Sequence, residues 1–197
     1  MIAGHFATAL VPYELTRKSD PVPVWLFLLA AQFLDVLMMI FVSLGIETME
    51  PEDAFEVSFS GLQTDMFVSH DLLPVVGWAA LFGVATWLIW RKPVIALWCV
   101  GLVAFHEVCD LIVGYPHEVV RGVGPIGMAL YVNAPILSFL IEAAMAAGIV
   151  FWFCRRRANS GQPVSTGTQV ILYAVLVGTT LATLPLANDS INSLLGL

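Results

Sequence analysis

The stretch that decides the fold is residues 93–113, which read PVIALWCVGLVAFHEVCDLIV and are apolar apart from His106, Glu107 and Asp110 near the end. A helix of this length is about 30 Å long at a rise of about 1.5 Å per residue, which matches the hydrocarbon core of a bilayer. The basic pair Arg91 and Lys92 precedes it directly. The stretch therefore predicts a transmembrane helix that carries ionisable side chains.

The composition of the whole chain agrees with a membrane protein. Hydrophobic residues make up 59% of it, charged residues only 12%, and the mean hydropathy is +0.87. Soluble domains carry about 25% charged residues. Including 93–113, the expected spans are about 23–46, 70–90, 93–113, 132–154 and 168–187. We expect an all-α membrane protein with a single transmembrane domain over residues 1–197, a polytopic bundle of about five transmembrane helices.

The N-terminal segment, residues 1–15, is apolar but too short to span a bilayer. It lacks a basic region and a small-residue cleavage site, so we do not interpret it as a signal peptide. Pro12 is expected to end any helix that forms there. The segment is predicted to be a short interfacial helix on the membrane surface or a re-entrant helix packed against protein.

The distribution of lysine and arginine predicts the orientation. With the spans above, one side of the membrane receives Arg17, Lys18, Arg91, Lys92, Arg155, Arg156 and Arg157. Arg121 falls on the other side. Because basic residues are retained in the cytoplasm, we expect a cytoplasmic N-terminus and an external C-terminus. The chain has no basic patch with interleaved aromatic residues, so we expect no nucleic-acid partner.

Several ionisable residues fall inside the predicted spans. Asp35 lies midway along the first, His106 and Asp110 lie four apart on the third, and Glu142 lies midway along the fourth. His70 stands where the second span begins. Each such group costs about 2.5–3.5 kcal/mol on insertion scales, so it needs a partner or a function. Their depths along the helices overlap, so we expect Asp35, His70, His106 and Asp110 to share one site.

The residue types at this site suit a metal ion. His-x-x-x-Asp on one helix face, with a distant histidine and further carboxylates, is a plausible ligand set for zinc or another divalent ion. The alternative is that each histidine only makes a hydrogen bond between helices. Asp71 and His117 are expected to be solvated loop residues. The loop with Glu47, Glu50, Glu52, Asp53, Glu56 and Asp65 is expected to be a wet external surface.

The chain resembles a family of bacterial inner-membrane proteins named as metal-dependent hydrolases, which includes a LexA-regulated member. The resemblance covers roughly residues 4–155 and consists of several short motifs. These are Gly4-His5-Phe6, Ala30-Ala31-Gln32-Phe33-Leu34-Asp35, Ser69-His70, His106-Glu107-Val108-Cys109-Asp110, and Asn133 with Glu142. The resemblance implies that His5, Asp35, His70, His106 and Asp110 surround a metal, and that the protein lies in the bacterial inner (cell) membrane.

The chain departs from the family pattern after the third span. Where the family usually has His-Arg-Pro-Asp, this sequence has Gly114, Tyr115, Pro116 and His117. A histidine and an arginine of the family are therefore replaced here, which bears on catalysis more than on the fold. His117 is a candidate substitute for the missing histidine if a loop bends it back.

We therefore carry three hypotheses. The first is a membrane-embedded hydrolase that acts on a lipid or other amphiphile. It has zinc, manganese or iron on His70, His106 and Asp110, with Asp35 either as a fourth ligand or next to the ligands. In it, Asp35 or Glu142 is the catalytic general base for a metal-activated water. The second is a catalytically inactive accessory subunit that associates with other membrane subunits. The third is a transporter or proton conductor that uses Asp35, His106, Asp110 and Glu142 as a relay. The absence of an internal repeat argues against an alternating-access carrier.

Overall fold

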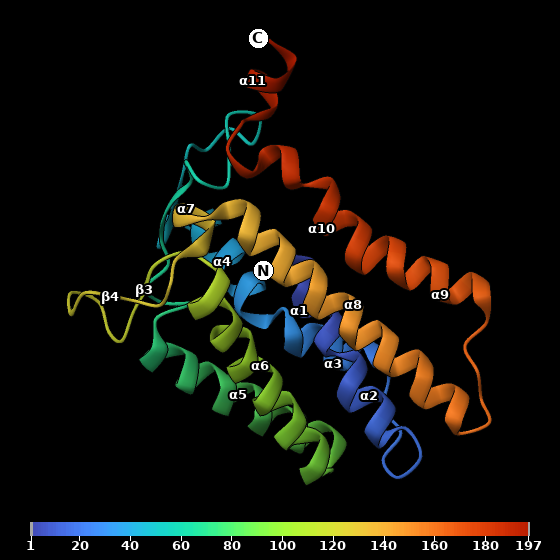
Figure 1. The fold of residues 1–197 in the computed structure, drawn as a ribbon. Coiled ribbons are helices and arrows are strands. Elements are labelled where there is room, and N and C mark those ends of the chain that lie inside the picture. The colour runs from blue at the N-terminus through green and yellow to red at the C-terminus, as the bar shows by residue number, and fades with distance from the viewer. Residues whose placement is uncertain (1, 197) are drawn as a thin grey trace.

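The computed structural model describes residues 2–196, and nearly all of the regular structure is helical (Figure 1). In chain order the helices are α1 (Ile2–Thr8), α2 (Leu10–Thr16), α3 (Val24–Ala31), α4 (Phe33–Ser43), α5 (Leu72–Trp90), α6 (Pro93–Val113), α7 (Leu130–Asn133), α8 (Pro135–Asn159), α9 (Thr166–Tyr173), α10 (Thr179–Ala182) and α11 (Ile191–Leu195), with a π-helical turn η1 (Ala174–Gly178) and a 3-10 turn η2 (Leu184–Ala187). Two antiparallel hairpins complete it, β1 (Thr48–Glu50) with β2 (Gln63–Asp65) and β3 (His117–Glu118) with β4 (Pro125–Ile126). The predicted all-helical class is confirmed.

Three helices, α5, α6 and α8, are long and apolar enough to cross a membrane, with 19, 21 and 25 residues respectively. The pair α3 and α4 passes the same test together but is bent by 58°, so the described residues contain up to four such segments. The segment expected as a fifth span contains a shorter apolar helix, Thr166–Ala182. It runs beside α8 on the outside of the bundle (Figure 1).

The bend between α3 and α4 lies at Gln32, whose backbone is not helical (φ −111°, ψ 9°). In a continuous helix the Ala31 carbonyl would accept the backbone N–H of Asp35. Here it accepts a hydrogen bond from Nδ1 of the His106 ring, at 2.7 Å. A side chain that takes a carbonyl from the helical ladder is a recognised cause of a kink. Asp35 consequently lies in the first turn of a separate helix.

The N-terminal segment lies inside the bundle, where α1 packs against α8 and α3 (Figure 1). Ala7 and Ala9 are fully buried, and Ala7 packs in one cluster with Ala146 and Val150 of α8. Small residues at this contact allow the helix backbones to approach closely. Of the two predicted placements, the structure therefore has the one packed against protein. Pro12 does not end the helix as expected, because it lies in the first turn of α2, where proline is tolerated.

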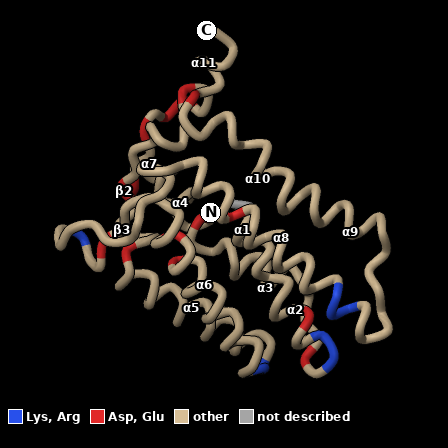
Figure 2. The backbone as a smooth tube through the Cα atoms, viewed as in Figure 1, with Lys and Arg blue, Asp and Glu red and all other residues tan. Residues whose placement is uncertain are grey.

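Charged residues separate between the two ends of the bundle. Figure 2 shows Lys and Arg at the ends of α2 and α8 and at the turn between α5 and α6, which lie at one end, with one further basic residue at the β3–β4 hairpin. Most Asp and Glu lie at the other end or near the centre (Figure 2). The basic end of the bundle is thus built from segments far apart in the sequence.

Helices α5 and α6 form the most extensive helix pair, and Gly83 sets how closely they approach. A Cβ atom at Gly83 would lie 2.3 Å from Cγ2 of Val100, whereas one at Gly77 on the same helix would meet nothing within 4 Å. We expect Gly83→Leu to lower the free energy of unfolding by about 1–3 kcal/mol through overpacking. Thermal unfolding in detergent measures this, with Gly77→Leu as the matched control. Equal melting temperatures of the two variants would contradict the packing described for this pair.

Candidate metal centre

Four side chains converge on one point inside the bundle, and they could hold a metal ion. Asp35 comes from the first turn of α4, His70 from the turn before α5, and His106 and Asp110 from successive turns of α6. One ligand atom from each lies within 4.8 Å of all the others. His70, His106 and Asp110 are buried, and the Asp35 side chain is 24% exposed.

The distances between these atoms suit a tetrahedral ion. His106 Nε2 lies 3.3 Å from Asp110 Oδ2 and 3.7 Å from Asp35 Oδ1. His70 Nε2 lies 3.6 Å from Asp35 Oδ1 and 3.8 Å from Asp110 Oδ2. Ligand bonds of about 2.0–2.1 Å to zinc correspond to tetrahedral edges of about 3.3–3.4 Å. The four His–Asp distances are thus within about half an ångström of the spacing that an ion requires, and all six distances among the four atoms are at most 4.8 Å.

The His106 ring is oriented with a lone pair toward the other ligands. Its Nδ1 lies 2.7 Å from the Ala31 carbonyl, which can only accept, so Nδ1 carries the proton. Nε2 is then the unprotonated nitrogen of a neutral ring. This atom is buried and has no hydrogen-bond partner. A histidine held through one nitrogen by a backbone carbonyl is the usual arrangement of a metal ligand.

The His70 ring is oriented in the same way through Ser69 and Glu47. The Ser69 hydroxyl lies 2.8 and 3.0 Å from the two carboxylate oxygens of Glu47 and 2.7 Å from His70 Nδ1. Because the hydroxyl donates to the carboxylate, it accepts from His70, and His70 Nε2 is left with the lone pair. Glu47 also accepts the backbone N–H groups of Val68 and Ser69. The two rings therefore present equivalent nitrogens.

Glu47 is a functional residue that the sequence interpretation missed. It was expected in a wet external loop, but its side chain is 1% exposed and fully engaged with residues 68 and 69. The loop between α4 and α5 folds back so that this one carboxylate lies beneath the start of α5. Acidic residues occur along the whole of this loop, so nothing in the sequence distinguished Glu47 from its solvent-exposed neighbours.

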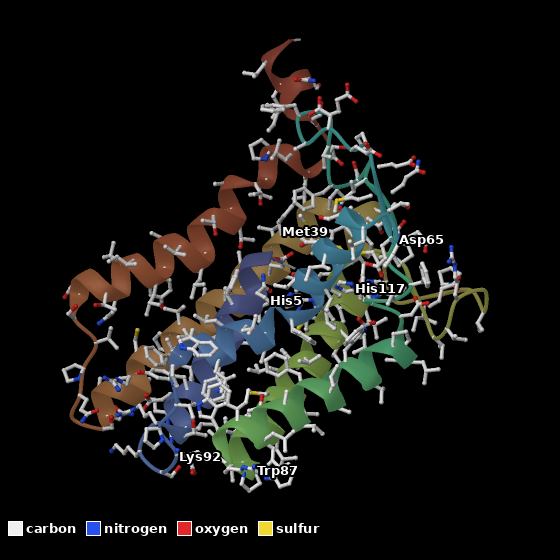
Figure 3. All side chains as sticks on the ribbon, turned by 180° about the vertical axis from the view of Figure 1, so that it is seen from behind. His5, Met39, Asp65, Trp87, Lys92 and His117 are labelled. Carbon is white, nitrogen blue, oxygen red and sulfur yellow. The ribbon has the colours of Figure 1, made fainter. Side chains whose placement is uncertain are left out.

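His5, from α1, lies against the four residues but outside that set. Its ring centroid is 3.6 Å from that of His106, with the planes tilted by 30°. Its Nδ1 is 3.9 Å from Asp35 Oδ2 and its Nε2 is 3.5 Å from Asp110 Oδ1. These are the carboxylate oxygens opposite those that face His70 and His106, and neither ring nitrogen of His5 has a hydrogen-bond partner. Figure 3 shows His5 in the middle of the molecule.

Glu142 is buried in α8 and engages residues outside the four. The Tyr131 hydroxyl donates to its carboxylate, and the backbone of Gly4 at the start of α1 lies near it. Glu142 therefore anchors α7 and the start of α1. It positions the helix that carries His5.

His117 and Asp71 are buried, so the expectation that both are solvated is wrong. His117 Nδ1 lies 2.9 Å from Glu107 Oε1 and 3.0 Å from the His70 carbonyl. Burial alone would lower the pKa of His117, but the Glu107 carboxylate outweighs it and raises that pKa above its ordinary value. Asp71 accepts the backbone N–H of Glu118. Both residues fix the β3 segment beside His70.

A groove of about 500 Å³ leads to Asp35 from the side of the bundle. Its walls are Phe6, Gln32, Val36, Met39, Ile40, Ser43 and Leu44, so it is mostly apolar. Figure 3 shows Met39 on α4 above His5. The partly exposed carboxylate of Asp35 is thus the member of the cluster that faces an opening.

Comparison of the chain with family models, with curated proteins and with solved structures finds no match. The functional interpretation therefore rests on the residues of the centre.

The Ser69 hydroxyl is expected to set metal affinity without being a ligand. Ser69→Ala removes the acceptor that holds the proton on His70 Nδ1, and loss of such a supporting contact typically weakens metal affinity about 10–100-fold. Zinc titration against a chromophoric chelator measures the dissociation constant. Ser60→Ala, a serine without such a contact, is the control. An unchanged affinity in Ser69→Ala would show that the Glu47–Ser69 contact does not orient the histidine.

Proposed function

We propose that this chain is a membrane-embedded, metal-dependent hydrolase of the bacterial inner membrane, as its resemblance to that family implies. In this proposal it crosses the membrane about five times, with a cytoplasmic N-terminus and external C-terminus. The ion, with zinc as first choice, is held by His70, His106 and Asp110, with Asp35 either as a fourth ligand or beside the ligands.

One observation carries the proposal: four electron-pair donors face one another in a largely buried site. The Nε2 atoms of His70 and His106 each lie 3.3–3.8 Å from the nearest oxygens of Asp35 and Asp110. Such an arrangement is repulsive unless a cation or a proton lies among the four atoms. A divalent ion would neutralise both carboxylates and use both lone pairs.

A divalent ion on His70, His106 and Asp110 would supply Lewis acidity and, in its fourth position, a water that is nucleophilic near neutral pH. Asp35 would then lie beside the ligands, and it is the better of the two candidate general bases. Its Oδ2 is buried, has no hydrogen-bond partner and belongs to the residue that lines the groove. Glu142, by contrast, is already bonded to Tyr131. His5 Nδ1 lies 3.9 Å from Asp35 Oδ2, so a proton taken up by Asp35 would reach His5 only through a bridging water or a small movement of the ring.

The groove supports a lipid or another amphiphile as the substrate class. Apolar side chains of α4 line it, and they include Val36, Met39 and Ile40, each at least 40% exposed. A substrate with an apolar chain would contact these residues while its polar bond lies beside Asp35. A polar, water-soluble substrate would gain no binding free energy from apolar walls of this kind.

The accessory-subunit hypothesis keeps one specific support. A Cβ atom at Gly114 would lie 2.7 Å from the Asp110 carbonyl, so the family's histidine would not fit this backbone. The Tyr115 hydroxyl donates to the Phe59 carbonyl, and His117 is hydrogen-bonded to Glu107. None of the three therefore replaces the missing catalytic groups of the family.

His106→Ala is expected to abolish metal binding and to reduce hydrolysis of an amphiphilic ester at least about 100-fold. Elemental analysis of the detergent-purified protein and an ester-cleavage assay measure the two effects. Asp65→Asn, in the distant β2 strand, is the control and should keep both. Full activity in His106→Ala would rule out the mechanism. Stoichiometric metal without cleavage of any ester, together with co-purifying membrane proteins, would favour the accessory subunit.

Met39→Trp is expected to obstruct the groove while leaving the metal ligands unchanged. Metal content should stay the same and KM for a long-chain ester should rise about tenfold, equivalent to about 1.4 kcal/mol of lost binding. Ile89→Trp, at a strongly exposed position of α5, is the matched control. An unchanged KM would mean that the substrate reaches the centre by another route.

A further inference from the structure

At the basic end of the bundle, α2 and α8 enclose a hollow of about 650 Å³. Ten residues line it: Glu14, Leu15, Arg17, Lys18, Phe151, Trp152, Arg155, Arg156, Asn159 and Ser160. We propose that this hollow binds the phosphate-bearing headgroup of an anionic membrane lipid. The proposal depends on the membrane placement of α8 and is independent of the metal centre and of hydrolysis.

The one acidic residue of the hollow is already neutralised. Glu14 is buried and bonds through both oxygens to Arg17, at 2.5 and 3.1 Å. Arg157 approaches the same carboxylate at 3.7 Å. Arg17 further donates to Gln162 and to Ser160, so it ties α2 to the end of α8. These contacts lie at the floor of the hollow, and they leave Arg17 already paired with Glu14.

The remaining cations are available to a ligand. Among the described residues, Lys18 and Arg155 make no ion pair, and Arg156 only lies over the Trp152 ring at 5.7 Å. Lys18 follows α2 while both arginines belong to α8, so the fold brings three positive charges together from segments far apart in the sequence. A phosphate group would be contacted by arginine forks and a lysine ammonium, the groups that bind it best.

The rest of the lining distinguishes a lipid from a free anion. Leu15 and Phe151 are exposed apolar residues on the same hollow, 39% and 57% exposed, and Trp152 is of the type that lies at membrane interfaces. A free phosphate would make no contact with these apolar side chains. A glycerophospholipid has its phosphate next to its acyl chains, so the phosphate would contact the cations while the acyl chains contact the apolar side chains. The volume also falls within the range of small-molecule sites, about 300–1,000 Å³.

Retention of basic residues in the cytoplasm would by itself require no such hollow. The turn between α5 and α6 provides the comparison within the same molecule. Arg91 lies over the Trp87 ring at 5.8 Å and Lys92 donates to the Pro21 carbonyl. Figure 3 shows Trp87 and Lys92 together at this end. This pair has the same charge as Arg155 and Arg156 but does not line the hollow between α2 and α8.

Native mass spectrometry and thermal unfolding of the full chain in neutral detergent test the proposal, with phosphatidylglycerol, phosphatidylcholine and inorganic phosphate as separate additions. Phosphatidylglycerol should remain bound and raise the melting temperature in a concentration-dependent way. The dissociation constant of phosphatidylglycerol should rise about tenfold or more in R155Q/R156Q. It should rise less in Lys18→Gln, which is the variant to measure if the double variant does not fold. The control R91Q/K92Q removes the same charge and should bind as the native protein does.

Three results would overturn the proposal. Equal binding of phosphatidylcholine would remove the role of the anionic headgroup. Equal loss in R155Q/R156Q and R91Q/K92Q would show only general attraction to surface charge. Stabilisation by inorganic phosphate as strong as by the lipid would mean a site for free phosphate. A chain without His70 and His106 should bind the lipid normally, so failure of the hydrolase proposal would leave this one intact.

Discussion

The hydrogen bond from the His106 ring to the Ala31 carbonyl is the interaction on which the centre depends. It places the proton on Nδ1, which leaves the opposite nitrogen as a ligand. It also takes the carbonyl that would otherwise accept from Asp35, at the point where α3 and α4 are bent by 58°. One contact thus sets the chemistry of a histidine and the position of a carboxylate from another helix.

The centre is held by buried polar contacts that extend beyond the four candidate ligands. Glu47 and Ser69 orient His70, Glu107 and His117 pack beneath it, and Glu142 secures the helix that carries His5. Buried polar groups of this kind are costly unless each finds a partner. Most of these groups have found one, whereas His106 Nε2 and both nitrogens of His5 have none. These three nitrogens face the cluster.

The sequence was sufficient for the parts of the fold that depend on local pattern. The bounds of α5 and α6 lie within two residues of the predicted spans, because an apolar run bounded by charges fixes the length of a helix. The convergence of His106 and Asp110 with Asp35 and His70 followed from helix spacing and depth. The break at Gln32 and the burial of Glu47 did not, because each depends on a partner distant in sequence, Ala31 with His106 and Glu47 with Ser69.

The N-terminal segment links the two ends of the molecule. Its first helix brings His5 to the cluster, and its second is followed directly by Arg17 on the floor of the basic hollow. Both helices pack against α8, and at the contact of α1 the small residues Ala7 and Ala146 permit close approach. A segment too short to span a bilayer is therefore enclosed by the longer helices of the bundle. This placement explains why a histidine near the start of the chain can reach residues of α4 and α6.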